Sequence, residues 1–143
     1  MNRLRVLLAE DNAGDVLLVR EALAKYEIPH ELHVVRDGGE ALAFVARIGE
    51  DSEDNTTPCP ELLLLDLNLP KADGPTVLAA FRRHPLCAHT PVIAISSSDA
   101  VTDRERLARL GVSRYFRKPM ELDKFLELGA VIRELMGEAG AGL

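Results

Sequence analysis

Short, largely apolar runs alternate with stretches of helical pattern along the whole chain. Five such runs, at residues 4–9, 31–35, 62–65, 92–95 and 115–117, are each followed by apolar residues at helical spacing. Apolar runs of this length are typical of strands that are buried on both faces of a parallel sheet. The alternation therefore predicts an α/β protein whose strands are joined by right-handed helical crossovers.

The same alternation favours the flavodoxin-like (βα)5 class, in which a five-stranded parallel sheet has the order 2-1-3-4-5 and helices on both faces. We expect a single domain over residues 1–136 and a flexible tail at residues 137–143. The helices are expected at residues 12–26, 38–48, 75–84, 99–110 and 122–136, with Asn12 as the first N-cap and Asp99 or Thr102 as the fourth.

Composition excludes several classes of protein. The net charge of −6 argues against non-specific binding of nucleic acid. Cys59 and Cys87 are too few and too unpatterned for a disulfide framework or a zinc site, which favours a reducing cytosol. The start of the chain lacks the apolar region of a signal peptide, and no apolar run is long enough to span a membrane. A cytoplasmic protein is expected.

Polar residues follow four of the predicted strands where those strands end. Glu10 and Asp11 follow the first strand, Asp66 the third, Ser96 the fourth and Lys118 the fifth. In an open parallel sheet the carboxyl ends of the strands form the ligand-binding edge, and the strand order places the first and third strands side by side. We therefore expect these five side chains to lie together.

The chemistry of this set favours a metal ion and a phosphoryl group. Two carboxylates about 4 Å apart repel each other by about 4 kcal/mol at an effective dielectric constant of about 20, so a cation must share the site. Oxygen ligands of this kind suit Mg²⁺, with Mn²⁺ as a possible substitute. Lys118 and Ser96 suit phosphoryl oxygens, and the set predicts phosphoryl transfer to an aspartate. The plainer interpretation is a polar sheet edge with scattered ion pairs.

With these residues the chain resembles the receiver domains of two-component response regulators over its whole length. The resemblance implies that Asp66 accepts a phosphoryl group from a sensor histidine kinase and that Ser96 and Lys118 hold that group. It implies Mg²⁺ bound by Glu10, Asp11, Asp66 and the backbone carbonyl of Asn68. Two further features come with the family: a switch formed by Ser96 and the aromatic Tyr115, and a cis peptide bond before Pro119.

Loop style is similar to that of the regulators that partner phytochrome-type kinases. The features are the start Glu-Asp-Asn at residues 10–12, the acidic loop before the third strand and the segment at residues 67–71. The resemblance implies a stand-alone regulator that signals through a downstream protein or shuttles phosphate. It implies no enzymatic activity beyond the chain's own phosphorylation and dephosphorylation.

Two alternatives belong to other functional classes. Haloacid-dehalogenase-type phosphatases also use an aspartate at the end of a strand, but they need a second acid two residues later, where this chain has Asn68. Turnover of small phosphate esters would identify them. A receiver-like binding module without phosphorylation would fail to react with acetyl phosphate.

The last helix carries apolar residues on two sides. One stripe includes Leu122, Phe125 and Ile132 and is expected to pack on the sheet. A second group, Leu128, Val131 and Leu135, points away from that stripe at spacings of three and seven residues. Because an apolar side is normally covered, this pattern predicts a homodimer through the second group.

Overall fold

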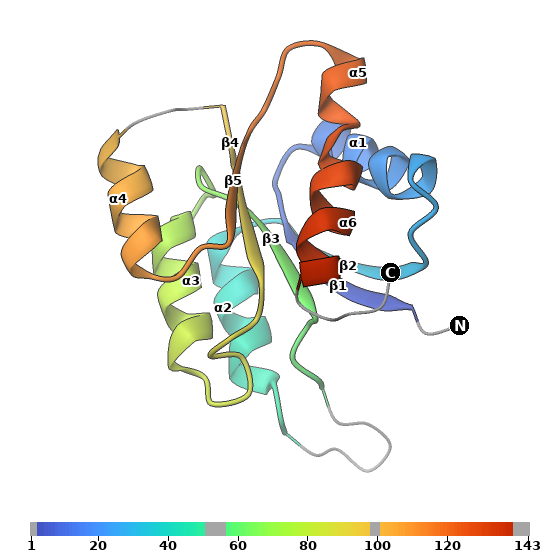
Figure 1. Cartoon of the computed structure of the whole chain (residues 1–143). Helices are drawn as coiled ribbons and strands as arrows, with labels where there is room; N and C mark the ends of the chain where they lie inside the picture. The colour runs from blue at the N-terminus through green and yellow to red at the C-terminus, as the bar shows by residue number, and fades with distance from the viewer. Residues whose placement is uncertain (1–2, 51–56, 98–100, 139–143) are drawn as a thin grey trace.

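The structure is a computed structural model that describes residues 3–50, 57–97 and 101–138, apart from the side chains of residues 101–103. Its strands form one parallel sheet in the order β2-β1-β3-β4-β5 (Figure 1). The strands are β1 (Leu4–Ala9), β2 (His30–Val35), β3 (Leu62–Asp66), β4 (Val92–Ser96) and β5 (Arg114–Arg117). This order confirms the predicted flavodoxin-like class.

Helices cover both faces of the sheet (Figure 1). One face carries α1 (Ala13–Lys25), α5 (Leu122–Phe125) and α6 (Leu128–Glu138), and the other carries α2 (Gly38–Arg47), α3 (Gly74–Arg83) and α4 (Val101–Arg109). The starts of α1, α2 and α3 are capped by Asn12, Asp37 and Asp73, whose side chains accept the backbone N–H three residues later. None of the described helices combines the length and the apolar character that a membrane span requires.

Strand β3 lies in the middle of the sheet and separates two hydrophobic cores. Leu63 and Leu65 belong to the core under α2, α3 and α4, whereas Leu62 and Leu64 belong to the core under α1 and α6. All four leucines are fully buried. Both faces of the strand are thus apolar, and the only chemistry that it delivers is Asp66 at its carboxyl end.

The last helix differs from the prediction in a way that removes the predicted dimer surface. Leu128 and Leu135 are buried within the chain and Val131 is half-buried, whereas Leu122 is 53% exposed. Around residues 126–130 the backbone hydrogen bonds reach back three residues instead of four, as from Gly129 N–H to the Leu126 carbonyl. Such bonds tighten the turn and rotate the following residues about the helix axis. Leu128 therefore faces the core, and the prediction that these three residues point outward is wrong.

Three further expectations at the carboxyl half are corrected. The Lys118–Pro119 peptide bond is trans, the isomer favoured by about 0.5–1 kcal/mol before proline, so the predicted cis bond is wrong. Helix α6 continues through Glu138 into the segment predicted as a tail, and the rest of that tail, residues 139–143, lies outside the described residues. Asp99 also lies outside them, while Thr102 falls inside α4 and is not its cap.

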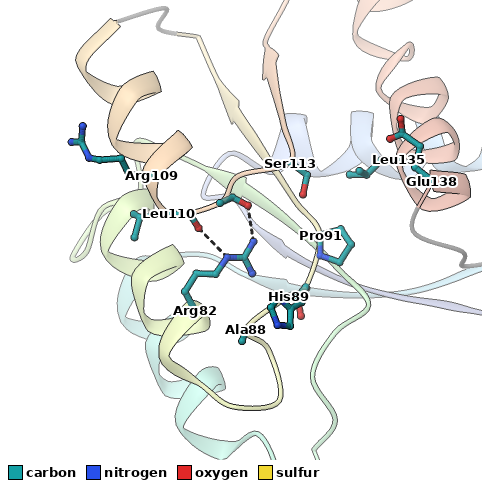
Figure 2. A pocket seen from close by; sticks show the side chains of 11 residues that line it. Arg82, Ala88, His89, Pro91, Arg109, Leu110, Ser113, Leu135 and Glu138 are labelled. Carbon is teal, nitrogen blue, oxygen red and sulfur yellow. Dashed lines mark hydrogen bonds between the residues drawn. The ribbon is translucent and has the colours of Figure 1, made fainter.

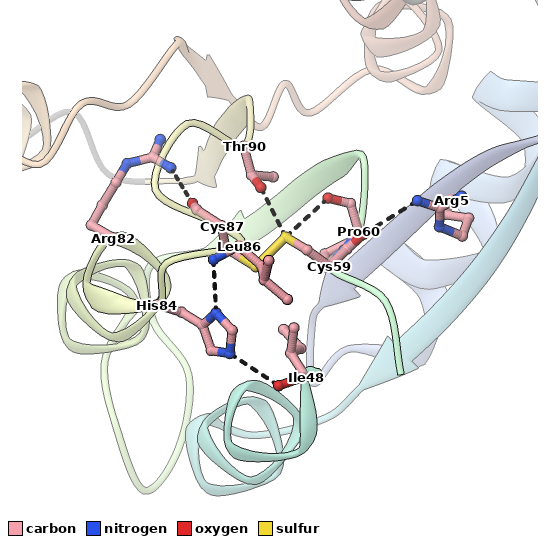
Figure 3. The surroundings of a disulfide bond; sticks show 9 residues. All are labelled: Arg5, Ile48, Cys59, Pro60, Arg82, His84, Leu86, Cys87 and Thr90. Carbon is pink, nitrogen blue, oxygen red and sulfur yellow. Dashed lines mark hydrogen bonds between the residues drawn. A yellow bond between two sulfur atoms is a disulfide. The ribbon is translucent and has the colours of Figure 1, made fainter. Parts of the chain in front are cut away.

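The two cysteines form a disulfide, contrary to the prediction that they are reduced (Figure 3). Cys59 precedes β3 and Cys87 precedes β4, and these two strands are neighbours in the sheet. Their Cα atoms lie 5.8 Å apart, and the Thr90 hydroxyl lies 3.0 Å from the Cys59 sulfur. The bond joins two loops at the edge opposite to the carboxyl ends of the strands.

We expect reduction of this disulfide to lower the thermal stability of the chain. The bond closes a loop with a sequence separation of 28 residues, and closing a loop of that size lowers the entropy of the unfolded chain by an amount worth about 3–4 kcal/mol. The melting temperature should fall by roughly 10 °C in reductant, measured by circular dichroism. A Cys59→Ser variant should melt at the reduced temperature with or without reductant. An unchanged melting temperature of the native chain would contradict the stabilising role.

A second tie at the same edge comes from Arg82 of α3 (Figure 2). Its guanidinium donates to the carbonyl oxygens of Leu110, Gly111 and Cys87 at 2.9, 2.9 and 3.2 Å. Leu110 and Gly111 follow the end of α4, where helix carbonyls lack intrahelical partners. Arg82 lines a hollow of about 590 Å³ and fixes the end of α4 to α3.

Candidate functional site

Three carboxylates meet at the carboxyl edge of the sheet. Strands β1 and β3 are paired so that Ala9 lies beside Leu65, which brings the following residues, Glu10 and Asp66, side by side. Carboxylate oxygens of Glu10, Asp11 and Asp66 all lie within 4.8 Å of one another. Glu10 and Asp66 are buried and Asp11 is exposed. The structure thus brings together the acidic residues that the sequence predicted.

Lys118 reaches the same place from the end of β5. Its backbone N–H donates to the Ser96 carbonyl at 2.8 Å, which ties the end of β5 to the end of β4. Its ammonium lies 2.9 Å from Glu10 Oε1 and 3.2 Å from Asp66 Oδ2. A cation therefore already shares the acidic cluster, although Glu10 and Asp11 have no cationic neighbour in sequence.

Burial and crowding perturb both kinds of charge. Burial, followed by the neighbouring Asp66 carboxylate, raises the pKa of Glu10 to about 8, against the opposing effect of Lys118. Burial lowers the pKa of the Lys118 ammonium, but the surrounding carboxylates, Asp15 and Glu10 first, outweigh it and leave that pKa raised. Lys118 is therefore a permanent positive charge within an excess of acid.

Asp66 is held in place from two sides. Its Oδ1 accepts the backbone N–H of Asn68 at 3.0 Å, while its Oδ2 faces Lys118. The Asn68 side-chain amide donates to the Ser96 hydroxyl at 3.5 Å, and Ser96 itself is fully buried. Glu10, Asp11 and Lys118 thus lie beside one aspartate, and Ser96 is linked to it through Asn68.

One residue of the site escaped the prediction. Asp15, in the first turn of α1, places its Oδ2 2.8 Å from the Lys118 ammonium, closer than either Glu10 or Asp66. In sequence, an acid three residues after the N-cap Asn12 is explained by the helix dipole alone. The available signal was its distance from Asp11: four residues on, at the start of a helix that leaves the same sheet edge.

Tyr115, the predicted switch residue, lies on β5 with a half-buried ring. The ring packs against the core under α2, α3 and α4, and the Arg104 guanidinium lies 4.5 Å from its centroid. Arg104 belongs to α4, so the ring connects β5 with that helix.

The donor set fits a divalent cation. It consists of carboxylate oxygens only, which suits Mg²⁺ and Mn²⁺. Among the described residues, no cationic side chain lies within ion-pair distance of Asp11, and one lysine does not neutralise the cluster. The contribution of the Asn68 backbone carbonyl stays a prediction.

Comparisons with known proteins agree with this geometry. The family described as "Response regulator receiver domain" matches residues 6–129. The response regulator Rcp1 of Synechocystis sp. is 38% identical over 123 residues, which cover 86% of this chain and 82% of Rcp1. The structure of the phosphorylated cyanobacterial phytochrome response regulator RcpA is 38% identical, covers 93% of both chains and superimposes with a TM-score of 0.81. The structure of the Mn²⁺-bound form of Rcp1 is 37% identical, covers 90% of both chains and has a TM-score of 0.77.

These matches favour the receiver over both alternatives, the haloacid-dehalogenase-type phosphatase and the unphosphorylated binding module. They extend over the strands that supply Glu10, Asp66, Ser96 and Lys118. This chain belongs to the response regulator receiver domain family.

Proposed function

We propose that this receiver accepts a phosphoryl group on Asp66 from a histidine kinase of the phytochrome type. The observation that carries the proposal is the position of Asp66, buried at a strand end between the Lys118 ammonium and the Asn68 backbone N–H. The likeness to Rcp1 and RcpA supports the type of kinase.

In the proposed reaction, an Asp66 carboxylate oxygen forms a bond to phosphorus while the bond from phosphorus to the donor breaks. The donor, a phosphohistidine or acetyl phosphate, leaves with the electron pair of that bond. Lys118 donates to one oxygen of the transferred phosphoryl group, and the Ser96 hydroxyl donates to another of its oxygens. Glu10, Asp11, Asp66 and the Asn68 carbonyl would hold a divalent ion, which supplies positive charge to the phosphoryl oxygens when bound.

The phosphorylated chain signals through contacts with a downstream protein or passes the phosphoryl group on, and it catalyses only its own phosphorylation and dephosphorylation. We place it in the cytoplasm, where histidine kinases draw on ATP. This placement rests on the kinase alone. The Cys59–Cys87 disulfide gives it no support, because disulfides are rare in a reducing cytosol.

Phosphotransfer profiling tests the proposal. Each histidine kinase of the source genome is phosphorylated with labelled ATP and mixed briefly with this chain. A phytochrome-type kinase should transfer label faster than the others. Transfer at equal rates from unrelated kinases would contradict the phytochrome assignment, and absence of transfer from all of them would contradict the function.

A homodimer remains a prediction, to be measured by light scattering at micromolar concentration with and without beryllofluoride. The structure removes its original basis, because Leu128 and Leu135 are buried within the chain.

We expect phosphorylation to move Ser96 and Tyr115 together. A phosphoryl oxygen on Asp66 offers the Ser96 hydroxyl a new acceptor, which draws the end of β4 inward and gives the Tyr115 ring room to turn. Turning separates the ring from Arg104, which now lies over it. A crystal structure with beryllofluoride, compared with one without it, measures this change. Identical positions of Ser96 and Tyr115 in the two would contradict the switch.

A further inference from the structure

The Lys118 ammonium has an acceptor for each of its N–H groups. An ammonium carries three N–H donors, and the three carboxylate oxygens around it, from Asp15, Glu10 and Asp66, lie 2.8, 2.9 and 3.2 Å away. A phosphoryl group on Asp66 adds further oxygens that need donors. The hydrogen bond that Lys118 now gives to Asp66 can pass to one of these oxygens, but Lys118 can donate to a second only if Asp15 or Glu10 gives way.

Asp15 is the acceptor that is easiest to release. Its side chain is 23% exposed, against 2% for Glu10 and 6% for Asp66, so water replaces the lost hydrogen bond at Asp15 but not at the other two. Glu10 is further held by the backbone N–H of Asn12, which donates to its Oε2 at 3.2 Å.

The backbone position of Asp15 is fixed independently of Lys118. Its backbone N–H donates to the Asn12 side chain at 3.0 Å, which fixes the first turn of α1. The carboxylate is therefore presented to Lys118 by the helix itself. It adds one negative charge near Asp66, the phosphoryl acceptor that an anionic phosphoryl donor must approach.

We propose that Asp15 is a positioning residue that competes with the incoming phosphoryl group for Lys118 and thereby slows phosphorylation of Asp66. This inference rests on the proposed function. It assigns Asp15 no contact with the reacting atoms, because it acts through Lys118 and through its charge.

The test compares rates of phosphorylation by acetyl phosphate in Mg²⁺, which needs no kinase contact. Asp15→Asn should raise the rate about two- to fivefold, the size expected from a partly exposed ion pair. Asp15→Glu should return the rate towards the native value. Glu21→Gln, which removes the same charge from an exposed position of the same helix, should leave the rate unchanged. Asp15→Ala, favoured within a helix, serves if the asparagine variant folds poorly.

A second readout follows Lys118 directly. The side-chain ammonium resonance of Lys118, recorded by NMR without a phosphoryl donor, should shift in Asp15→Asn and stay in place in Glu21→Gln. An unmoved resonance, or an Asp15→Asn rate equal to or below the native rate, overturns the inference. If the native chain takes no label from acetyl phosphate, the proposed function fails and the role of Asp15 in phosphorylation fails with it. The resonance then still decides whether Asp15 holds Lys118.

Discussion

Replacing Asp66 with asparagine should reduce labelling by acetyl phosphate to background. The amide of asparagine lacks the anionic oxygen that attacks phosphorus. Glu10 also lies between Lys118 and a backbone N–H, but Asp66 is the carboxylate at the end of the central strand β3. The native chain, by contrast, should take up label that is stable in acid and released by hydroxylamine, as expected for an acyl phosphate. The measurement is label retained on the denatured protein after incubation in Mg²⁺.

The substitution should leave the fold intact, which makes the comparison clean. An asparagine oxygen still accepts the Asn68 N–H, and Lys118 keeps Glu10 and Asp15 as partners. Melting temperature and circular dichroism confirm this before labelling. Glu21→Gln, far from the strand ends, should label like the native chain. Labelling of Asp66→Asn at the native level would place the acceptor on another residue.

Replacing Asp11 with alanine should weaken the binding of Mg²⁺ and Mn²⁺ by at least about fivefold. Asp11 is the exposed member of the acidic cluster, whereas the ion pairs with Lys118 neutralise part of the negative charge of Glu10 and Asp66. Loss of one unit charge at ligand distance costs about 1–4 kcal/mol, depending on the effective dielectric constant, and each 1.4 kcal/mol is a factor of about ten in affinity. Titration of the protein with the metal ion alone measures the effect.

A matched variant separates the ligand role from the loss of net charge. Glu21→Ala also removes one negative charge from an exposed position, on α1, and should leave the affinity within about twofold of the native value. Equal weakening in the two variants would mean that Asp11 acts through long-range charge only. Unchanged affinity in Asp11→Ala would contradict the predicted ligand set.

Strand positions and the acidic cluster could be predicted because local pattern and topology point to the same result. The four leucines before Asp66 and the alternation of elements along the chain favour a strand buried on both faces, and the structure begins and ends β3 at Leu62 and Asp66. Once the strand order is known, Glu10 and Asp66 must be neighbours. Asn12 could be named as a cap because its side chain has one favourable use before a helix.

Features that depend on packing in three dimensions could not be predicted. The tightened turn near Glu127 decides which side of α6 is buried, and helical periodicity assumes a constant turn. Cys59 and Cys87 meet because the loops before β3 and β4 are adjacent, a consequence of strand order rather than of cysteine spacing. The contact between Asp15 and Lys118 was not predicted, because the helix dipole already explains an acid in the first turn of a helix.

The Arg82 guanidinium and the Cys59–Cys87 bond lie at the edge of the sheet opposite to Asp66. One edge of the sheet therefore stabilises the fold, and the other carries the phosphorylation site. Natural variation in this chain can be interpreted accordingly. Substitutions at the stabilising edge alter how much folded protein a cell contains. Substitutions at the phosphorylation site alter how long and how strongly that protein signals. Two variants with an equal loss of response can thus behave differently when a stabilising substitution is added elsewhere. The added substitution restores the response of a variant at the stabilising edge and leaves that of a variant at the phosphorylation site unchanged.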